Sequence, residues 1–530
     1  MSTKRVLVIC LSEATLDLII PWAQQGLLPT LQSWIREGAL GRTAYGKPYL
    51  LTPQMWATIC TGRSAGQHGI FDYWQRGANG RFSETHGEDL QAPSFWSHLQ
   101  ERERRVGVVN VPMTYPPHRV QGLMISGQDA PGSHPSIFHP RSLHQDLTQR
   151  FGRYHLKDVF PGGQSRDEYA RMIPGEVERQ TNHLEYLIGS QDCDFFMCYY
   201  AATAMSQHYF WDQMQAAEAN ARASHVVLET YQAVDRSLAR LRAAAGSETT
   251  VFVISECGAG PLRRGVHLNA WLQREGYLEY RQAAGSFSQR RSLASRGVLS
   301  QIRKSAQKHL PKAAFYWANR SFLKCWIQER LAFSDIRWSS TRAYYRGKGE
   351  GNIYINLKGR DPQGIVQAGV EYEELCLELR ERLLQLRDPD SGEPAVVAVL
   401  RASELYQGSH TEAAPDLVVE WKDSAYMPSE SDRHKDQVFV DRWREYMNWP
   451  TTGSHRMHGL FLATGPGIQA GANLDQLNLL DLAPTFLHAM GVTPPEEYEG
   501  RVCREAFQTS ASLAQQPDKK NRRETKPSSP

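Results

Sequence analysis

Hydroxyl, carboxylate and thiol side chains stand directly after two strand-like runs of the sequence. Glu256 and Cys257 follow the apolar run VFVI, and Ser12 and Glu13 follow the apolar run VLVICL. The carboxyl ends of parallel strands meet at one edge of a sheet, which is where open α/β proteins bind ligands. We therefore expect Ser12, Glu256 and Cys257 to face one site.

Three further side chains could do chemistry with them. Thr52 precedes a proline and a helix-like segment, so we expect it at a helix N-terminus, which favours an anion or a nucleophile. The plainer alternative is that Thr52 only caps the helix. His208 follows a strand-like run, and His455 lies in GSHRMHG, where we expect a glycine-bounded turn. Either histidine alone is more often structural than catalytic, so only the combination indicates a site.

Apolar runs that alternate with helical patterns must position these side chains. Such alternation predicts an α/β fold with a mostly parallel sheet and crossover helices. Helices are expected at 28–41, which begins with Pro29 and ends on glycine, and at 367–387. The expected strands span residues 5–11, 105–111, 194–200, 250–256, 414–421 and 459–465.

The composition excludes several classes of protein. Of the 530 residues, 41% are apolar and 22% are charged, and the formal net charge of +3 gives no sign of a nucleic-acid partner. No apolar run reaches the length of a transmembrane segment, and the N-terminal run lacks the features of a signal peptide. Eight cysteines without regular spacing indicate buried thiols in a reducing compartment, so we predict a cytoplasmic location.

Two segments differ in composition from the rest. Residues 290–330 hold ten Lys or Arg and one acid, interleaved with tryptophan and phenylalanine. The plainer interpretation is a solvated amphipathic helical insertion, and the alternative is a cap that faces an anionic surface or substrate. We predict a first core part at 4–285, a basic helical insertion or cap at 286–345, a second core part at 346–510 and a disordered tail at 511–530.

The order and spacing of these segments resemble the alkaline phosphatase superfamily, in its branch of type I phosphodiesterases, nucleotide pyrophosphatases and predicted phosphohydrolases or phosphomutases. RVLVICLSEAT is similar to the opening strand, LTPQMWATICTG with HGIFDYW to the nucleophile segment, and SQHYFW to the start of a metal-ligand helix. Residues 341–366 resemble the phosphomutase-like members, and 476–492 with 499–502 resemble the C-terminal signature. The resemblance implies a three-layer α/β/α sandwich with an inserted cap and a threonine nucleophile.

The resemblance also implies two metal ions, and here the chain departs from the pattern. In the family, carboxylates and imidazoles hold both ions beside the nucleophile, and such hard ligands form a fixed cage for divalent cations. Of the seven positions concerned, this chain keeps Thr52, His208 and His455 and changes the other four to Ser12, Ala204, Glu256 and Cys257.

The changed positions leave little room for a tight two-metal site. One metal position keeps only His208 and His455, and two imidazoles bind a transition metal weakly. The other has Glu256 and Cys257 with two hydroxyls nearby, so a single altered zinc site is conceivable. Glu13, where the family has glycine, either adds a carboxylate to the site or faces solvent. We therefore expect no cofactor or one divalent metal such as zinc.

Three functions fit this pattern. The favoured one is a diverged hydrolase or transferase that works with few or no metals on a small or carrier-bound anionic substrate. Thr52 or Cys257 would attack an activated group. His208 or His455 would act as base, and Glu256 would orient an imidazole. The alternatives are an inactive family member that serves as a binding or regulatory scaffold, and a metal-dependent phosphohydrolase with an altered single-metal site.

Overall fold

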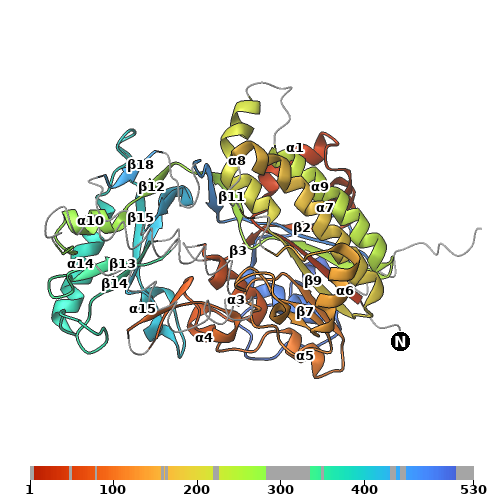
Figure 1. The fold of residues 1–530 in the computed structure, drawn as a ribbon, viewed down its shortest axis with the longest axis horizontal. Helices are drawn as coiled ribbons and strands as arrows, with labels where there is room; N and C mark the ends of the chain where they lie inside the picture. Colours follow the sequence, from red (N-terminus) through yellow and green to blue (C-terminus); the bar gives the residue numbers. More distant parts are fainter. Residues whose placement is uncertain are drawn as a thin grey trace, which may run out of the picture.

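The structure, a computed structural model, contains an α/β core with a smaller lobe beside it (Figure 1). The predicted tail at 511–530 and residues 286–334 of the predicted insertion lie outside the described residues. The structure describes residues 5–46, 50–77, 80–156, 160, 165–218, 226–281, 335–347, 351–429, 437–441 and 449–508.

A nine-stranded sheet forms the centre of the core, in the order β21-β2-β20-β10-β1-β9-β6-β7-β8. The strands from β10 to β7 are parallel, whereas β20 and β8 pair antiparallel on either side of them. The predicted mostly parallel sheet is therefore confirmed. The strands are β1 (Arg5–Leu11), β2 (Ala39–Gly41), β6 (Val106–Val109), β7 (Gly122–Ile125), β8 (Phe138–His139), β9 (Phe195–Tyr200), β10 (Thr249–Ile254), β20 (Phe461–Thr464) and β21 (Ala472–Asn473).

Helices cover both faces of this sheet, which makes the predicted three-layer α/β/α sandwich (Figure 1). Strand β1 shows the cause, because its alternate side chains enter different hydrophobic clusters: Val6 and Val8 enter one, Leu7 and Ile9 the other. The first face carries α3 (Thr52–Thr61), α4 (Ala65–His68), α5 (Trp96–Gln100) and α16 (Leu482–Ala489), and the second carries α1 (Leu16–Gln24), α2 (Pro29–Glu37), α6 (Ser142–Phe151), α7 (Arg166–Ser190), α8 (Ala202–Glu218) and α9 (Val226–Ala245).

The smaller lobe has its own sheet and its own hydrophobic cluster. Four antiparallel strands in the order β13-β14-β16-β15 form it, beside the three-stranded sheet β17-β12-β18. The helix predicted at 367–387 is α14, and the strand predicted at 414–421 is β16. The elements are β12 (Arg264–Val266), β13 (Ala343–Tyr345), β14 (Gly351–Ile355), β15 (Val396–Arg401), β16 (Leu417–Trp421), β17 (Tyr426–Pro428), β18 (Phe439–Val440), α10 (Leu268–Arg274), α14 (Val370–Leu384) and α15 (Ala402–Leu405).

One part of the predicted domain division needs correction. The insertion predicted as helical up to residue 345 ends in strand β13, because residues 343–345 pair with β14. The boundaries at 285, 345 and 510 otherwise stay predictions. The remaining short strands are β3 (Thr43–Ala44), β4 (Trp74–Arg76), β5 (Phe82–Glu84), β11 (Gly258–Pro261), β19 (Gly453–Arg456) and β22 (Leu477–Asn478).

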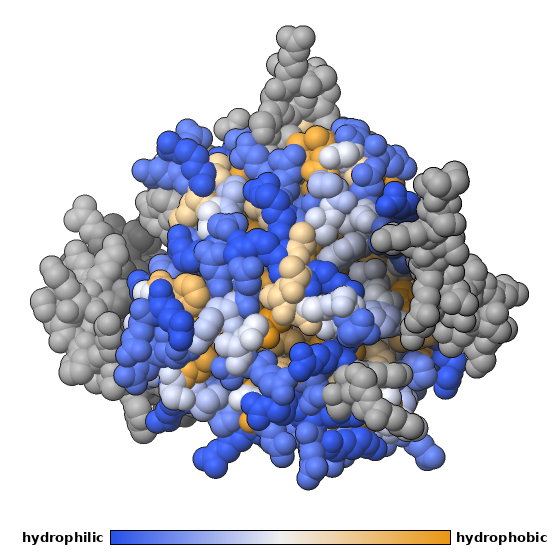
Figure 2. Space-filling model, turned by 90° about the vertical axis from the view of Figure 1, so that its right-hand side faces the viewer, coloured by the Kyte–Doolittle hydropathy of each residue, from blue (hydrophilic) through white to orange (hydrophobic). Residues whose placement is uncertain are grey.

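The polar surface and the buried cysteine thiols of the structure agree with what the composition predicts. Hydrophilic residues dominate the face of the molecule that Figure 2 shows. Among the described residues, no helix has the length and apolar character needed to cross a membrane. None of the seven described cysteines forms a disulfide, and six of the seven are buried. The cytoplasmic location itself stays a prediction.

Candidate functional site

The carboxyl ends of three neighbouring strands bring most of the predicted site residues together. Strand β1 lies between β10 and β9, with Cys10 beside Ile254 and Leu11 beside Tyr200. The loop after β1 therefore starts next to the loop after β10 and next to the start of α8. The sequence predicted from the strand ends that these loops lie at one edge of the sheet, and the register of the strands places them there.

Ser12, Glu256, Cys257 and Tyr199 form what we call the closed half of the site. The hydroxyl of Tyr199 donates to Ser12 Oγ at 2.7 Å, and Ser12 Oγ donates to Glu256 Oε1 at 2.8 Å. All four side chains are buried, and Cys257 belongs to the hydrophobic cluster beneath the sheet. Protein atoms thus satisfy the polar groups of this half without any added ligand.

Burial also sets the charge of the closed half. Removal from water raises the pKa of Glu256 to about 7, the nearby Glu13 carboxylate adds to the rise, and the bond from Ser12 offsets only part of it. A metal site needs an ionised carboxylate that is available to the ion. With a pKa of about 7, Glu256 is only partly ionised near neutral pH, and its Oε1 already accepts a hydrogen bond from the Ser12 hydroxyl, so the closed half does not fit a metal ion.

Glu13, His208 and His455 form what we call the imidazole half. Nε2 of His208 lies 3.0 Å and Nε2 of His455 lies 3.1 Å from the same oxygen, Oε1 of Glu13. Burial by itself would raise the pKa of the Glu13 carboxyl, but the charges and hydrogen bonds of the two imidazoles hold that pKa well below its usual range. Glu13 therefore faces the site and not solvent, which decides between the two sequence-based alternatives.

The backbone around Glu13 is unusual for a glutamate. Its φ of 57° lies in the left-handed region, where a residue other than glycine carries strain. Neighbouring groups hold the loop, because Gln207 Nε2 donates to the Glu13 carbonyl at 3.0 Å and Thr203 Oγ1 donates to the Ser12 carbonyl at 2.6 Å. The loop is thus tied to α8, the helix that presents His208.

Two secondary-structure elements position the imidazoles. His208 lies in the second turn of α8, and its Nδ1 contacts the carbonyl of Gly453 at 3.1 Å. The glycine-bounded turn predicted around His455 is wrong, because residues 453–456 form strand β19. This strand pairs antiparallel with β11, where Ala259 lies opposite His455. Glu256 is bonded to Ser12, whereas both imidazoles contact Glu13, so the carboxylate beside the imidazoles is Glu13 and not the predicted Glu256.

Thr52 stands at the start of α3, as its sequence context predicts. It is the first helical residue after Leu51, and no side chain makes a capping hydrogen bond there, which removes support from the capping alternative. One turn later, the indole of Trp56 packs edge-on against the ring of Tyr199 with centroids 5.1 Å apart. Among the described residues no hydrogen bond joins Thr52 to the other predicted site residues, so α3 meets the site through Trp56.

Two residues that sequence reasoning did not assign, Tyr199 and Trp56, contribute to the site. Tyr199 lies in a strand that reads as an apolar run, and Trp56 lies in the helix-like segment after Thr52, so neither residue type by itself marks a site. Ala204, at a position where the family has a carboxylate, is buried on α8 and offers no ligand atom. For Tyr199, the alternation of β9 is the one signal that could place it on the face of Trp56.

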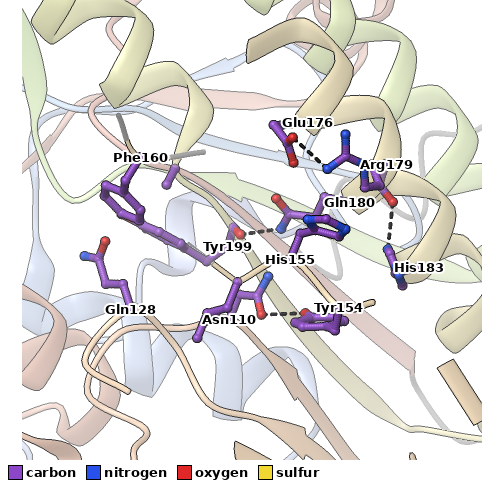
Figure 3. A pocket seen from close by; sticks show the side chains of 12 residues that line it. Asn110, Gln128, Tyr154, His155, Phe160, Glu176, Arg179, Gln180, His183 and Tyr199 are labelled. Atoms are coloured by element: carbon purple, nitrogen blue, oxygen red, sulfur yellow. Dashed lines mark hydrogen bonds and ion pairs between the residues drawn. The ribbon is translucent and has the colours of Figure 1, made fainter. Parts of the chain in front are cut away.

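A narrow pocket of about 30 Å³ lies beside the closed half, at the ends of β6 and β9. Figure 3 shows Tyr154 pointing to Asn110 and Gln180 of α7 reaching the carbonyl of Tyr199, with distances of 2.6 and 2.7 Å. None of its residues is among the sequence-predicted candidates. The pocket is lined by Asn110, Gln128, Tyr154, His155, Leu156, Phe160, Glu176, Arg179, Gln180, His183, Tyr199 and Ala201.

Comparisons with known proteins agree with this architecture. Murine ectonucleotide pyrophosphatase / phosphodiesterase 5, in an inactive form with AMP, has 12% sequence identity and a TM-score of 0.50, with 95% of this chain and 100% of that chain covered. Phosphonoacetate hydrolase from Sinorhizobium meliloti 1021, with phosphonoformate, has 13% identity and a TM-score of 0.51, with 92% and 96% covered. Both likenesses show a shared fold.

The sequence comparisons assign the chain to a family. No curated protein matches it significantly. The sequence profile described as type I phosphodiesterase / nucleotide pyrophosphatase matches residues 6–460, most of the chain and all of the elements that carry the site. The chain therefore belongs to the type I phosphodiesterase / nucleotide pyrophosphatase family, within the alkaline phosphatase superfamily.

Proposed function

We propose that this protein is a hydrolase that cleaves a phosphoryl or phosphonyl group from a small anionic substrate, with Thr52 as the nucleophile. The observation that carries the proposal is the convergence of Glu13, His208 and His455 at the sheet edge that α3 also approaches. Supporting it, one structural neighbour is a phosphonoacetate hydrolase, and the AMP complex of another is an inactive form in which a threonine is replaced by alanine.

Each part of the site has a role in this proposal. Thr52 at the helix start places its hydroxyl beside the free N–H groups of the first turn, which stabilise an anion there. The imidazole half carries positive charge on the other side, as two imidazolium protons or as a metal ion in their place, and offsets the charge of the reacting group. The closed half supports the loops and contributes no second cation.

The closed half also favours a second candidate function. Family chemistry relies on a clamp of two ions, and Ser12 bonded to Glu256 does not fit one of them. A family member that binds an anionic ligand or partner without turnover would need only the imidazole half. The same experiment separates the two candidates.

The experiment assays activated phosphate monoesters and diesters, phosphonates, sulfate esters and acyl thioesters. Wild type is compared with Thr52→Ala, with Thr52→Ser, and with Thr61→Ser at the other end of α3 as a matched control. We expect turnover to fall at least about 100-fold in Thr52→Ala, to be partly kept in Thr52→Ser and to be unchanged in Thr61→Ser. Equal turnover in wild type and Thr52→Ala would exclude the nucleophile. No turnover on any substrate would favour the binding function.

A further inference from the structure

We propose that Glu13, His208 and His455 form a binding site for a single divalent transition metal ion, zinc by its donor set. Glu13 supplies the carboxylate that position 204 lacks. One ligand atom from each of the three residues lies within 4.8 Å of the others, and among the described residues this is the group with that property. This site is part of the site of the proposed function. Binding of the ion does not depend on that function, and only the catalytic use of the ion rests on it.

The position of the ring hydrogen on His208 indicates a cation between His208 and Glu13. Nδ1 contacts the Gly453 carbonyl at 3.1 Å, so Nδ1 carries the hydrogen and donates it. In the neutral ring, Nε2 then presents a lone pair to Oε1 of Glu13, only 3.0 Å away. Two hydrogen-bond acceptors repel each other at that distance unless a proton or a metal ion lies between them. A carbonyl that accepts from the far ring nitrogen is also the usual support of a metal-binding histidine.

The second oxygen of Glu13 is a separate indication. Oε2 is buried and has no hydrogen-bond partner in the part of the chain that the structure describes. An ionised carboxylate oxygen in that condition is costly. A metal ion, or a water molecule held by one, would satisfy it.

The donor set and its spacing fit zinc. Two imidazoles and one glutamate are a ligand set of catalytic zinc sites, which keep a further position for water or substrate. With metal–ligand distances near 2.0 Å, tetrahedral ligand atoms stand about 3.3 Å apart, and in the structure the two imidazole nitrogens lie 3.0 and 3.1 Å from Oε1 of Glu13. The imidazole side chains are 13% and 19% exposed, so an ion could reach them from solvent.

Zinc binding to the purified, EDTA-treated protein tests the inference without any substrate. Isothermal titration with ZnCl₂ and elemental analysis should show one equivalent in wild type. Glu13→Gly suits the left-handed backbone and should fold, and it should weaken binding at least about 100-fold, beyond the loss typical of a supporting residue. The double variant Glu13→Gly with Ala204→Asp should restore binding, because the carboxylate returns from α8.

Glu256→Gln is the matched control, since it removes the other buried carboxylate of the site and should keep one equivalent. Wild type without zinc binding, or Glu13→Gly with unchanged binding, would overturn the inference. Loss of the ion in Glu256→Gln would overturn it too, because the ion would then lie in the closed half. A rise in melting temperature with zinc in wild type and not in Glu13→Gly would support it even if no substrate is turned over.

Discussion

The two halves of the site meet at the loop after β1, which carries Ser12 and Glu13, and they differ in how their polar groups are satisfied. In the closed half, a serine, a tyrosine and a partly protonated carboxyl satisfy one another through hydrogen bonds of 2.7 and 2.8 Å. In the imidazole half, two imidazoles share one oxygen of an ionised carboxylate whose other oxygen has no described partner. In the closed half protein groups thus satisfy one another, whereas the imidazole half leaves a buried carboxylate oxygen for the ion that we propose there.

Replacement of the imidazoles should give the largest effect. His208→Ala or His455→Ala removes a group that Glu13 contacts directly, so we expect turnover to fall at least about 1,000-fold and zinc binding to be lost. The control is His98→Ala on α5, which removes another largely buried imidazole beside a glutamate, Glu101, outside the two halves of the site. Normal kinetics and zinc stoichiometry in either site variant would contradict the role of the imidazole half.

The difference between the two halves should disappear when the closed half is given the carboxylate and imidazole groups of a metal site. In Ser12→Asp with Cys257→His, a second buried carboxylate faces Glu256 and should destabilise the metal-free protein by about 3 kcal/mol. Zinc should recover that loss and bind with a second equivalent. Thermal unfolding with EDTA and with zinc measures both. A single equivalent and an unchanged melting temperature would mean that the closed half tolerates charge without an ion.

The protonation of Glu256 gives a stability effect with a definite sign. Its pKa is raised to about 7 in the folded protein, so its contribution to stability is fully present below about pH 4.5 and is lost as pH rises to about 7. Relative to wild type, Glu256→Gln should gain up to about 3 kcal/mol across that range and stay level above it. Denaturant unfolding at pH 5, 6, 7 and 8 measures the difference. A difference that is constant across these values would show that Glu256 titrates normally.

The smallest expected effect is on stability at Thr52. No capping hydrogen bond is lost in Thr52→Ala, and alanine is the better helix former, so the free energy of unfolding should change by less than about 1 kcal/mol. Urea unfolding of this variant beside wild type measures it. A loss of 2 kcal/mol or more would mean that Thr52 supports the fold, and activity data on Thr52→Ala would then need that correction.

Sequence reasoning reached the loops of the site because apolar runs that end in polar residues mark strand ends. Ser12 and Glu256 were found in this way, whereas Thr52 was found from the proline and the helix-like segment that follow it. It failed where partners come from distant segments: His455 was expected in a turn, but its strand exists only because β11 lies beside it. Tyr199 and Trp56 look like core residues in the sequence, and only the packing of β9 against α3 joins them to Ser12 and Glu256.

The orientation of Glu13 was also beyond the sequence. A glutamate at a glycine-like position could face solvent or the site, and the choice depends on α8 and β19, which lie 195 and more residues away. The left-handed backbone of this residue is likewise invisible in the residue type. The sequence alone shows that four positions differ from the family's ligand pattern. The structure adds that the carboxylate of Glu13 lies beside the two remaining imidazoles.

The place of Glu13 in the chain has a consequence for folding. A carboxylate at position 204 would share one helix with His208, four residues apart, and such a pair can assemble in an isolated helix. Glu13 instead joins the first strand of the chain to α8 and to a strand near the C-terminal end. These groups meet only after the central sheet has closed. An ion held by them would act as a cross-link between remote parts of one chain, with no matching site in the unfolded polypeptide.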